Sequence, residues 1–77
     1  MVATLAERGL RVMVDRLSQH EIEIVVALAE GLTNREIAER VGSSEDAVAI
    51  DLSRVLRKLG LRNRVQVAVW AVKQGLY

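Results

Sequence analysis

The most constraining feature of this 77-residue chain is a regular series of helix start signals. Ser18 stands three residues before Glu21, and Thr33 stands three residues before Glu36. This spacing is the capping-box pattern, in which the two side chains bond otherwise unpaired amides at the start of a helix. Asn63, three residues before a glutamine, repeats the pattern with an asparagine as the cap. Three helix starts are therefore marked.

Glycines supply the matching stop signals after each apolar stretch. A glycine can adopt the left-handed conformation that ends a helix. The glycines in these positions are Gly31, Gly42, Gly60 and Gly75. Starts and stops together predict four helices, over residues 19–30, 34–41, 45–59 and 64–74. No segment alternates long enough to form a strand, so the predicted fold class is all-α.

The first 16 residues are less clearly organised. Leu10, Met13 and Val14 stand at helical spacing and predict an extra helix over residues 5–15, but Gly9 weakens it. Residues 1–16 are therefore either a linker or an additional helix, and residues 17–77 form the domain. No apolar run exceeds six residues, which is far below the roughly 18 of a membrane span, so the chain is expected to be soluble and cytoplasmic.

The composition argues against an enzyme. The chain contains no cysteine and one histidine, His20, which stands beside a capping box. No metal-ligand spacing, nucleophile elbow or phosphate-cradling glycine loop is present. The sequence therefore predicts no catalytic residue, no metal and no cofactor.

The segment 45–59 predicts the longest helix, and its two sides differ. At about 1.5 Å per residue it measures roughly 22 Å, enough to lie across a DNA major groove. The turn before it, residues 42–44, has the length and the glycine typical of a helix-turn-helix, although a purely structural hairpin fits equally well. The apolar side of the predicted helix 45–59 carries Val48, Leu52, Val55, Leu56 and Leu59. Its outward side carries Asp46, Ile50, Ser53, Arg54 and Arg57.

The last helix is apolar nearly all round, and such a helix must be covered on more than one side. A domain this small offers few internal partners, so we expect a homodimer contact; the alternative is cover by the N-terminal segment. The expected contact stripe is Val65, Ala68, Val69 and Val72.

The helix at 19–30 carries a surplus stripe of Ile22, Val26 and Ala29. The N-terminal segment is its expected cover, and a regulatory domain or partner protein is the alternative.

The net charge of +1 conceals an asymmetry. Residues 1–51 carry five arginines and ten acids, whereas residues 52–77 carry six basic residues and no acid. The basic segment either attracts a polyanion or is simply a solvated helix face.

Four stretches carry a resemblance to a known family: residues 17–21, Ala29-Glu-Gly-Leu-Thr-Asn-Arg-Glu-Ile-Ala-Glu-Arg-Val-Gly42, Arg57-Lys-Leu-Gly-Leu-Arg-Asn-Arg64 and Ala68-Val-Trp-Ala71. Together they resemble the LuxR-type helix-turn-helix, also the output domain of NarL-like response regulators, over residues 17–76. The resemblance implies a four-helix domain whose third helix enters the major groove and whose fourth commonly forms the dimer contact. It implies a sequence-specific transcription regulator that binds double-stranded DNA as a homodimer, with an upstream regulatory domain or partner protein.

The third helix departs from the family pattern. Where the family commonly shows Lys-Thr-Val-Lys, a small or polar residue and His, this chain has Asp46-Ala47-Val48-Ala49-Ile50-Asp51. Carboxylates near phosphates are repelled, although Arg54 is placed to neutralise Asp51 in part. The alternative function is therefore a degenerate helix-turn-helix used for protein interaction, with weak or no DNA binding.

The residues expected to meet DNA come from the third helix and its surroundings. Ile50 can touch a thymine methyl, and Arg54 or Arg57 can read guanine. The flanking basic residues can bind the phosphate backbone of the DNA. Thr33 resembles a family position near phosphate, but its role as an N-cap alone is equally compatible. The full expected set is Thr33, Ala49, Ile50, Ser53, Arg54, Arg57, Lys58, Arg62 and Arg64.

Overall fold

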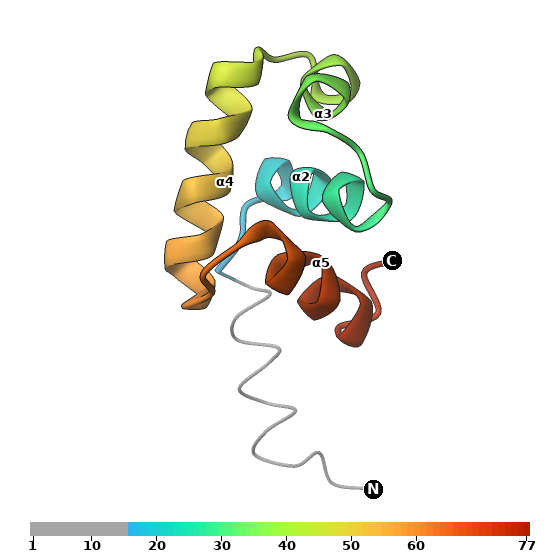
Figure 1. Cartoon of the computed structure of the whole chain (residues 1–77), viewed down its shortest axis with the longest axis vertical. Helices are drawn as coiled ribbons and strands as arrows, with labels where there is room; N and C mark the ends of the chain where they lie inside the picture. Colours follow the sequence, from blue (N-terminus) through green and yellow to red (C-terminus); the bar gives the residue numbers. More distant parts are fainter. Residues whose placement is uncertain (1–15) are drawn as a thin grey trace, which may run out of the picture.

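A computed structural model describes residues 16–77, and that part of the chain folds into four helices without a strand (Figure 1). They are α2 (Gln19–Ala29), α3 (Asn34–Val41), α4 (Glu45–Leu59) and α5 (Arg64–Lys73). The all-α, four-helix prediction is confirmed. Helices α2 and α5 end one residue earlier than predicted, because Glu30 and Gln74 are C-caps. The expected linker or extra helix over residues 1–16 lies outside the described residues, apart from Arg16.

The helix starts follow the local sequence. The Ser18 hydroxyl accepts from the Glu21 amide at 3.1 Å, and the Glu21 carboxylate accepts from the Ser18 amide at 2.9 Å. The same reciprocal pair joins Thr33 and Glu36, at 3.2 and 3.0 Å. Both predicted capping boxes are thus complete, which satisfies amides that the helices leave unpaired.

The start of α5 differs from the predicted pattern. The Asn63 side chain accepts from the Gln66 amide at 3.0 Å, as expected of a cap. The Gln66 side chain, however, accepts from the amide of Arg62 at 2.7 Å rather than from that of Asn63. The return bond is therefore shifted by one residue, and α5 begins with a cap but without a closed box.

The corner between α3 and α4 depends on a glycine. Gly42 ends α3 with φ at 69°, in the left-handed region that favours a residue without Cβ. Two residues later Ser44 caps α4, accepting from the Ala47 amide at 3.1 Å. The short turn and its two caps give the helix-turn-helix geometry that the sequence predicts.

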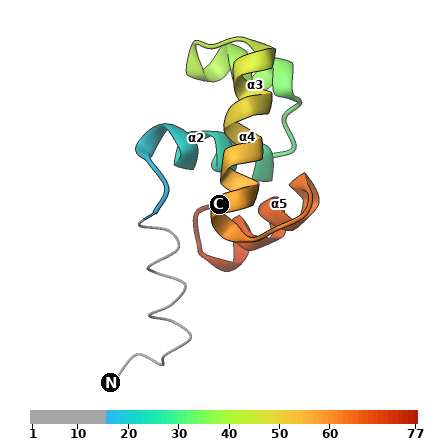
Figure 2. The ribbon, with the colours of Figure 1, turned by 90° about the vertical axis from the view of Figure 1, so that its left-hand side faces the viewer.

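The core lies between α2 and the other three helices. Helix α2 packs mainly against α5, and α3 packs mainly against α4, which runs along one side of the molecule (Figures 1 and 2). The predicted apolar face of α4 is buried, with Leu56 only partly so. The largest fully buried side chains are Ile24, Val25, Ile37, Val48, Val55 and Val67.

Two isoleucines of opposite burial test this core. Ile24 is fully buried, whereas Ile50 is 60% exposed. We expect Ile24→Ala to lower the free energy of unfolding by about 2–5 kcal/mol, because it removes buried methyl groups and leaves a cavity. Ile50→Ala should change it by no more than about 0.5 kcal/mol. Urea unfolding followed by Trp70 fluorescence measures both, and Ile24→Val, at about 0.5–1.5 kcal/mol, covers the case in which the alanine variant does not fold. Equal losses for Ile24→Ala and Ile50→Ala would contradict the assigned core.

Candidate nucleic-acid interface

The outward face of α4 is the candidate interface. Figure 2 looks onto the side of the molecule along which α4 runs. Because the opposite side of the helix is buried, five of the predicted groove-facing residues share one exposed surface. They are Ala49, Ile50, Ser53, Arg54 and Arg57.

The donors available on this face belong to the two arginines, although Arg54 Nη1 also pairs with Asp51. Ala49 has no polar side-chain atom, and the Ser53 hydroxyl donates to the Ala49 carbonyl of its own helix at 3.0 Å. Ser53 would have to give up that bond to donate to a phosphate. The Arg57 side chain has no hydrogen-bond or ion-pair partner among residues 16–77. The chemistry of the face therefore lies in guanidinium groups and the Ile50 methyls.

Two of the flanking basic residues hold the fold together. Lys58 donates to the Glu21 carboxylate at 2.7 Å, joining α4 to α2. Arg64 donates to the Asn34 side chain at 2.8 Å and to the Leu32 carbonyl at 3.0 Å, joining α5 to the start of α3. The structure therefore gives internal partners to two side chains that the sequence analysis assigns to DNA.

The remaining flanking positions are open to solvent. Arg62 is exposed in the turn before α5, and its side chain has no partner in the described part of the chain. Thr33 is also exposed, and its hydroxyl serves as the N-cap of α3. Hydrogen bonding to Thr33 holds the pKa of the Glu36 carboxyl below its usual value, so a negative charge stands at this helix start.

A buried carboxylate lies behind the interface. Glu21 is only 4% exposed. Burial raises the pKa of Glu21, but hydrogen bonds from Lys58 and from the Ser18 amide, with the Lys58 charge, together lower it below its usual value. Sequence reasoning treats Glu21 as part of a capping box alone, since nothing in the local pattern points to a residue 37 positions away.

A second cross-helix contact was also missed by the sequence analysis. His20, at the start of α2, contacts Asp51 of α4 through its Nε2 at 2.9 Å from Oδ2. On the other side of the carboxylate, Arg54 Nη1 lies 3.7 Å from Oδ1, which confirms the expected neutralising pair. The Asp51 side chain is 17% exposed, so it lies between its two partners rather than in open solvent.

The outer side of α5 is exposed and apolar. Val67, Trp70 and Ala71 face the core. The stripe expected to form a dimer contact lies on the other side, where Ala68 is half-buried. Its three valines are exposed: Val65 at 67%, Val69 at 48% and Val72 at 55%.

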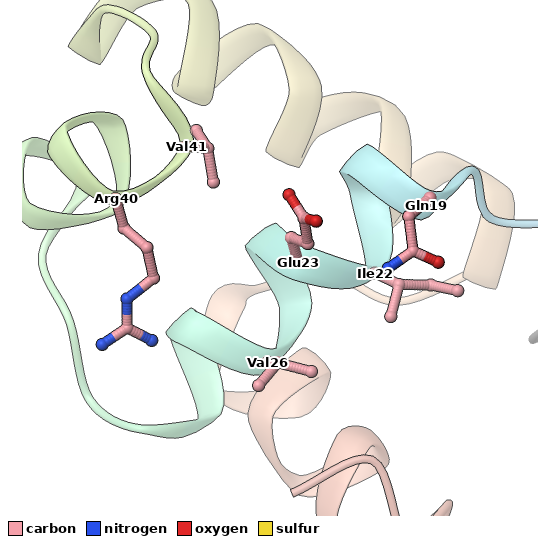
Figure 3. A pocket seen from close by; sticks show the side chains of 6 residues that line it. All are labelled: Gln19, Ile22, Glu23, Val26, Arg40 and Val41. Atoms are coloured by element: carbon pink, nitrogen blue, oxygen red, sulfur yellow. The ribbon is translucent and has the colours of Figure 1, made fainter.

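An open groove runs between α2 and α3 (Figure 3). Ile22, Glu23 and Val26 of α2 face Arg40 and Val41 of α3 across it. The groove measures about 370 Å³. Two members of the surplus stripe of α2 therefore line a hollow of mixed apolar and charged character.

Two kinds of site are not found among residues 16–77. That part of the chain brings together no group of three or more side chains able to hold a metal ion. None of its helices is long and apolar enough to cross a membrane.

A short helix, a glycine-containing corner and a longer helix with an arginine-bearing outer face define a helix-turn-helix domain. The chain belongs to the luxR family of bacterial regulatory proteins, whose family model matches residues 15–71. The resemblance found in the sequence is therefore confirmed.

Individual relatives support the same assignment. The chain is 38% identical over 60 residues to the transcriptional regulatory protein LnrK of Bacillus subtilis, covering 78% of this chain and 27% of the relative. It is 33% identical over 64 residues to the nitrate/nitrite response regulator NarL of Escherichia coli, covering 83% and 30%. It is 42% identical over 57 residues to the DNA-binding transcriptional activator DevR/DosR of Mycobacterium tuberculosis, covering 74% and 26%. The chain thus matches less than a third of the length of each of these relatives.

The Glu21 site predicts a specific pH dependence of stability. Since the pKa of Glu21 is lower in the fold than its ordinary value of 4.5, the ionised carboxylate stabilises the fold above that value. This contribution is lost as the pH falls through the lower folded-state pKa. Glu21→Gln, which preserves the capping pattern, should be less stable at neutral pH and should lose less stability below about pH 4.5.

Urea unfolding over a series of pH values measures this effect. Glu23→Gln is the matched control, because Glu23 is an exposed carboxylate of the same helix with no ion-pair partner in the described residues. It should keep the acid-dependent loss of the unaltered chain. A parallel decline of Glu21→Gln and the unaltered chain would show that ionisation of Glu21 adds nothing to stability.

Proposed function

We propose that the domain regulates transcription by placing α4 in a DNA major groove and reading base sequence there. The observation that carries the proposal is the pair of exposed guanidinium groups, Arg54 and Arg57, on the outer face of α4. An arginine fork can donate two hydrogen bonds to guanine O6 and N7, the commonest specific contact to a base. Ile50, exposed on the same face, suits the methyl group of thymine.

The proposed phosphate contacts come mainly from Arg62 and Thr33. Both are exposed, and neither side chain is held by an ion pair in the described residues. Lys58 and Arg64 stay in the proposed set, but they can contribute only through donors left over from their internal bonds. With Asp46 also exposed on α4, we expect weak sequence-independent binding, so base contacts have to supply much of the affinity.

The domain is proposed to act as a homodimer through α5. The exposed stripe of Val65, Val69 and Val72, with Ala68, is apolar and lies on the side of α5 away from the core. A two-fold contact buries this stripe against itself, which is the arrangement of the commonest oligomers. The two copies of α4 would then enter major grooves about 34 Å apart.

Control of the domain is proposed to come from a regulatory domain upstream or from a partner protein. The support is the short match to much longer relatives, one of which is a response regulator by name. In that arrangement residues 17–77 are the DNA-binding unit and residues 1–16 connect it to the regulatory part. The proposed compartment is the cytoplasm, where bacterial DNA is accessible.

A second candidate function is protein interaction by a degenerate helix-turn-helix. The groove between α2 and α3, lined by Ile22, Val26 and Val41, favours it, and so do the carboxylates at the start of α4. This function predicts no retardation of DNA at any practical protein concentration. The titration that tests the first function therefore also decides between the two.

An electrophoretic titration at low salt tests DNA binding directly. We expect the unaltered chain to retard duplex DNA and the double variant Arg54→Ala with Arg57→Ala to lose retardation, because each removed fork costs about 1–3 kcal/mol at its base. Lys73→Ala, which removes an exposed charge from α5, is the control for charge alone and should retard DNA nearly as well as the unaltered chain. Full retardation by the double variant would exclude α4 as the reading helix.

A matched pair of aliphatic-to-acid substitutions separates dimer formation from DNA contact. Val69→Glu introduces a carboxylate into the exposed stripe of α5 and should give a monomer, because a buried unpaired charge opposes association. Ile50→Glu places the same charge on the outer face of α4 and should leave the dimer intact while weakening DNA binding. Sedimentation equilibrium measures the mass of each variant. A Val69→Glu dimer would place the contact elsewhere.

A further inference from the structure

Asp51 is an unfavourable residue on a helix that approaches DNA, since phosphates repel a carboxylate. The structure nevertheless engages both of its oxygens. Oδ2 lies 2.9 Å from His20 Nε2, and Oδ1 lies 3.7 Å from Arg54 Nη1. The negative charge of Asp51 therefore lies between His20 and Arg54. Repulsion from phosphates does not explain why a carboxylate is held at this position.

His20 fixes the orientation of the carboxylate from a different helix. A carboxylate can only accept, so His20 donates through an Nε2–H group. The backbone that carries His20 is held by the Ser18 cap and by the buried Ile24 of the same helix. Asp51 thus has one oxygen bound to a rigid element, and its second oxygen is directed toward Arg54.

Arg54 is the side chain that gains from this arrangement. Its side chain is 58% exposed on the outer face of α4, and only Nη1 has an ion-pair partner in the described residues. The other donors remain available to a ligand. A long side chain held before binding loses less rotamer freedom when it binds, so a carboxylate beside Arg54 favours one presentation of the fork.

We propose that Asp51, held by His20, is a positioning residue that orients Arg54 to read guanine and so sets base specificity. The proposal rests on the DNA-binding function proposed above and names one base and one side chain within it. Asp51 contributes through Arg54 and touches no base itself. It lowers the general attraction to phosphates, since it offsets one positive charge, while it sharpens the choice of base.

The test begins with selection of duplexes by the full chain from a pool with a randomised central segment of about 20 base pairs. The same selection is carried out with Arg54→Ala. A guanine that is enriched by the unaltered chain but not by this variant is the guanine that Arg54 reads. Two probes are then compared: an enriched duplex, and the same duplex with A·T in place of that G·C pair. The ratio of their Kd values is the selectivity of each variant.

In Asp51→Ala the selectivity should be about tenfold lower than in the unaltered chain. The variant should bind the A·T duplex at least as tightly as the unaltered chain does. His20→Ala should shift selectivity the same way, and His20→Gln, whose amide can donate to Asp51, should restore part of it. Asp51→Ala combined with Arg54→Ala should be no less selective than Arg54→Ala alone, because both changes act on one contact.

Asp46→Ala is the matched control. It removes an exposed carboxylate from the same helix that has no ion pair among residues 16–77, so it should tighten both probes equally. An equal gain on both probes for Asp51→Ala would overturn the proposal, since Asp51 would then be a repulsive charge only. Circular dichroism at the assay temperature verifies that each variant is folded.

The result also separates this inference from the function beneath it. The unaltered chain can retard DNA while Asp51→Ala keeps the same selectivity. That outcome overturns the positioning role of Asp51 and leaves the regulator function in place. Failure of the unaltered chain to retard any duplex of the pool overturns both.

Discussion

The opposition between the two sides of α4 is the constraint on which the interface depends. Val48, Leu52 and Val55 are buried against the other helices, and the period of the α-helix then turns the side chains between them outward. The register of the helix is fixed at one end by the Ser44 cap and at the other by Gly60. The exposed arginines are therefore placed by the core, and any core change that rotates α4 would redirect them.

The same fold reduces the positive charge available to a ligand. The sequence concentrates six basic residues in its last third, without a single acid. In the structure Lys58 neutralises a buried carboxylate and Arg54 is partly offset by Asp51. Arg64 keeps its charge, but it donates to neutral groups at and just before the start of α3. A duplex would thus meet a weaker field than the composition suggests. In the proposed function, discrimination among bases then depends on few side chains, and their orientation matters more than their number.

Features of the fold could be predicted from the sequence where the interacting residues are close together in the chain. Caps and glycine stops act within a few residues, so the bounds of α3 and α4 were predicted correctly and those of α2 and α5 to within one residue. The exposed side of α4 followed from helical period alone. The contacts of Lys58 with Glu21 and of His20 with Asp51 join residues 37 and 31 positions apart, and no local pattern encodes them. They exist only because packing brings α2 beside α4. Only the structure therefore shows which basic residues hold the fold and which remain at the surface.

The shape of α5 shows why self-association and DNA contact are compatible in the proposed arrangement. A hollow of about 350 Å³ lies beside the valine stripe, lined in part by Leu61, Val65 and Trp70. A stripe that combines projecting valines with a hollow can be complementary to itself, which a two-fold contact requires. None of its residues belongs to the outer face of α4. Pairing through α5 therefore covers apolar surface that a small domain cannot bury alone. It uses no side chain from the face of α4 that is proposed to contact the DNA major groove.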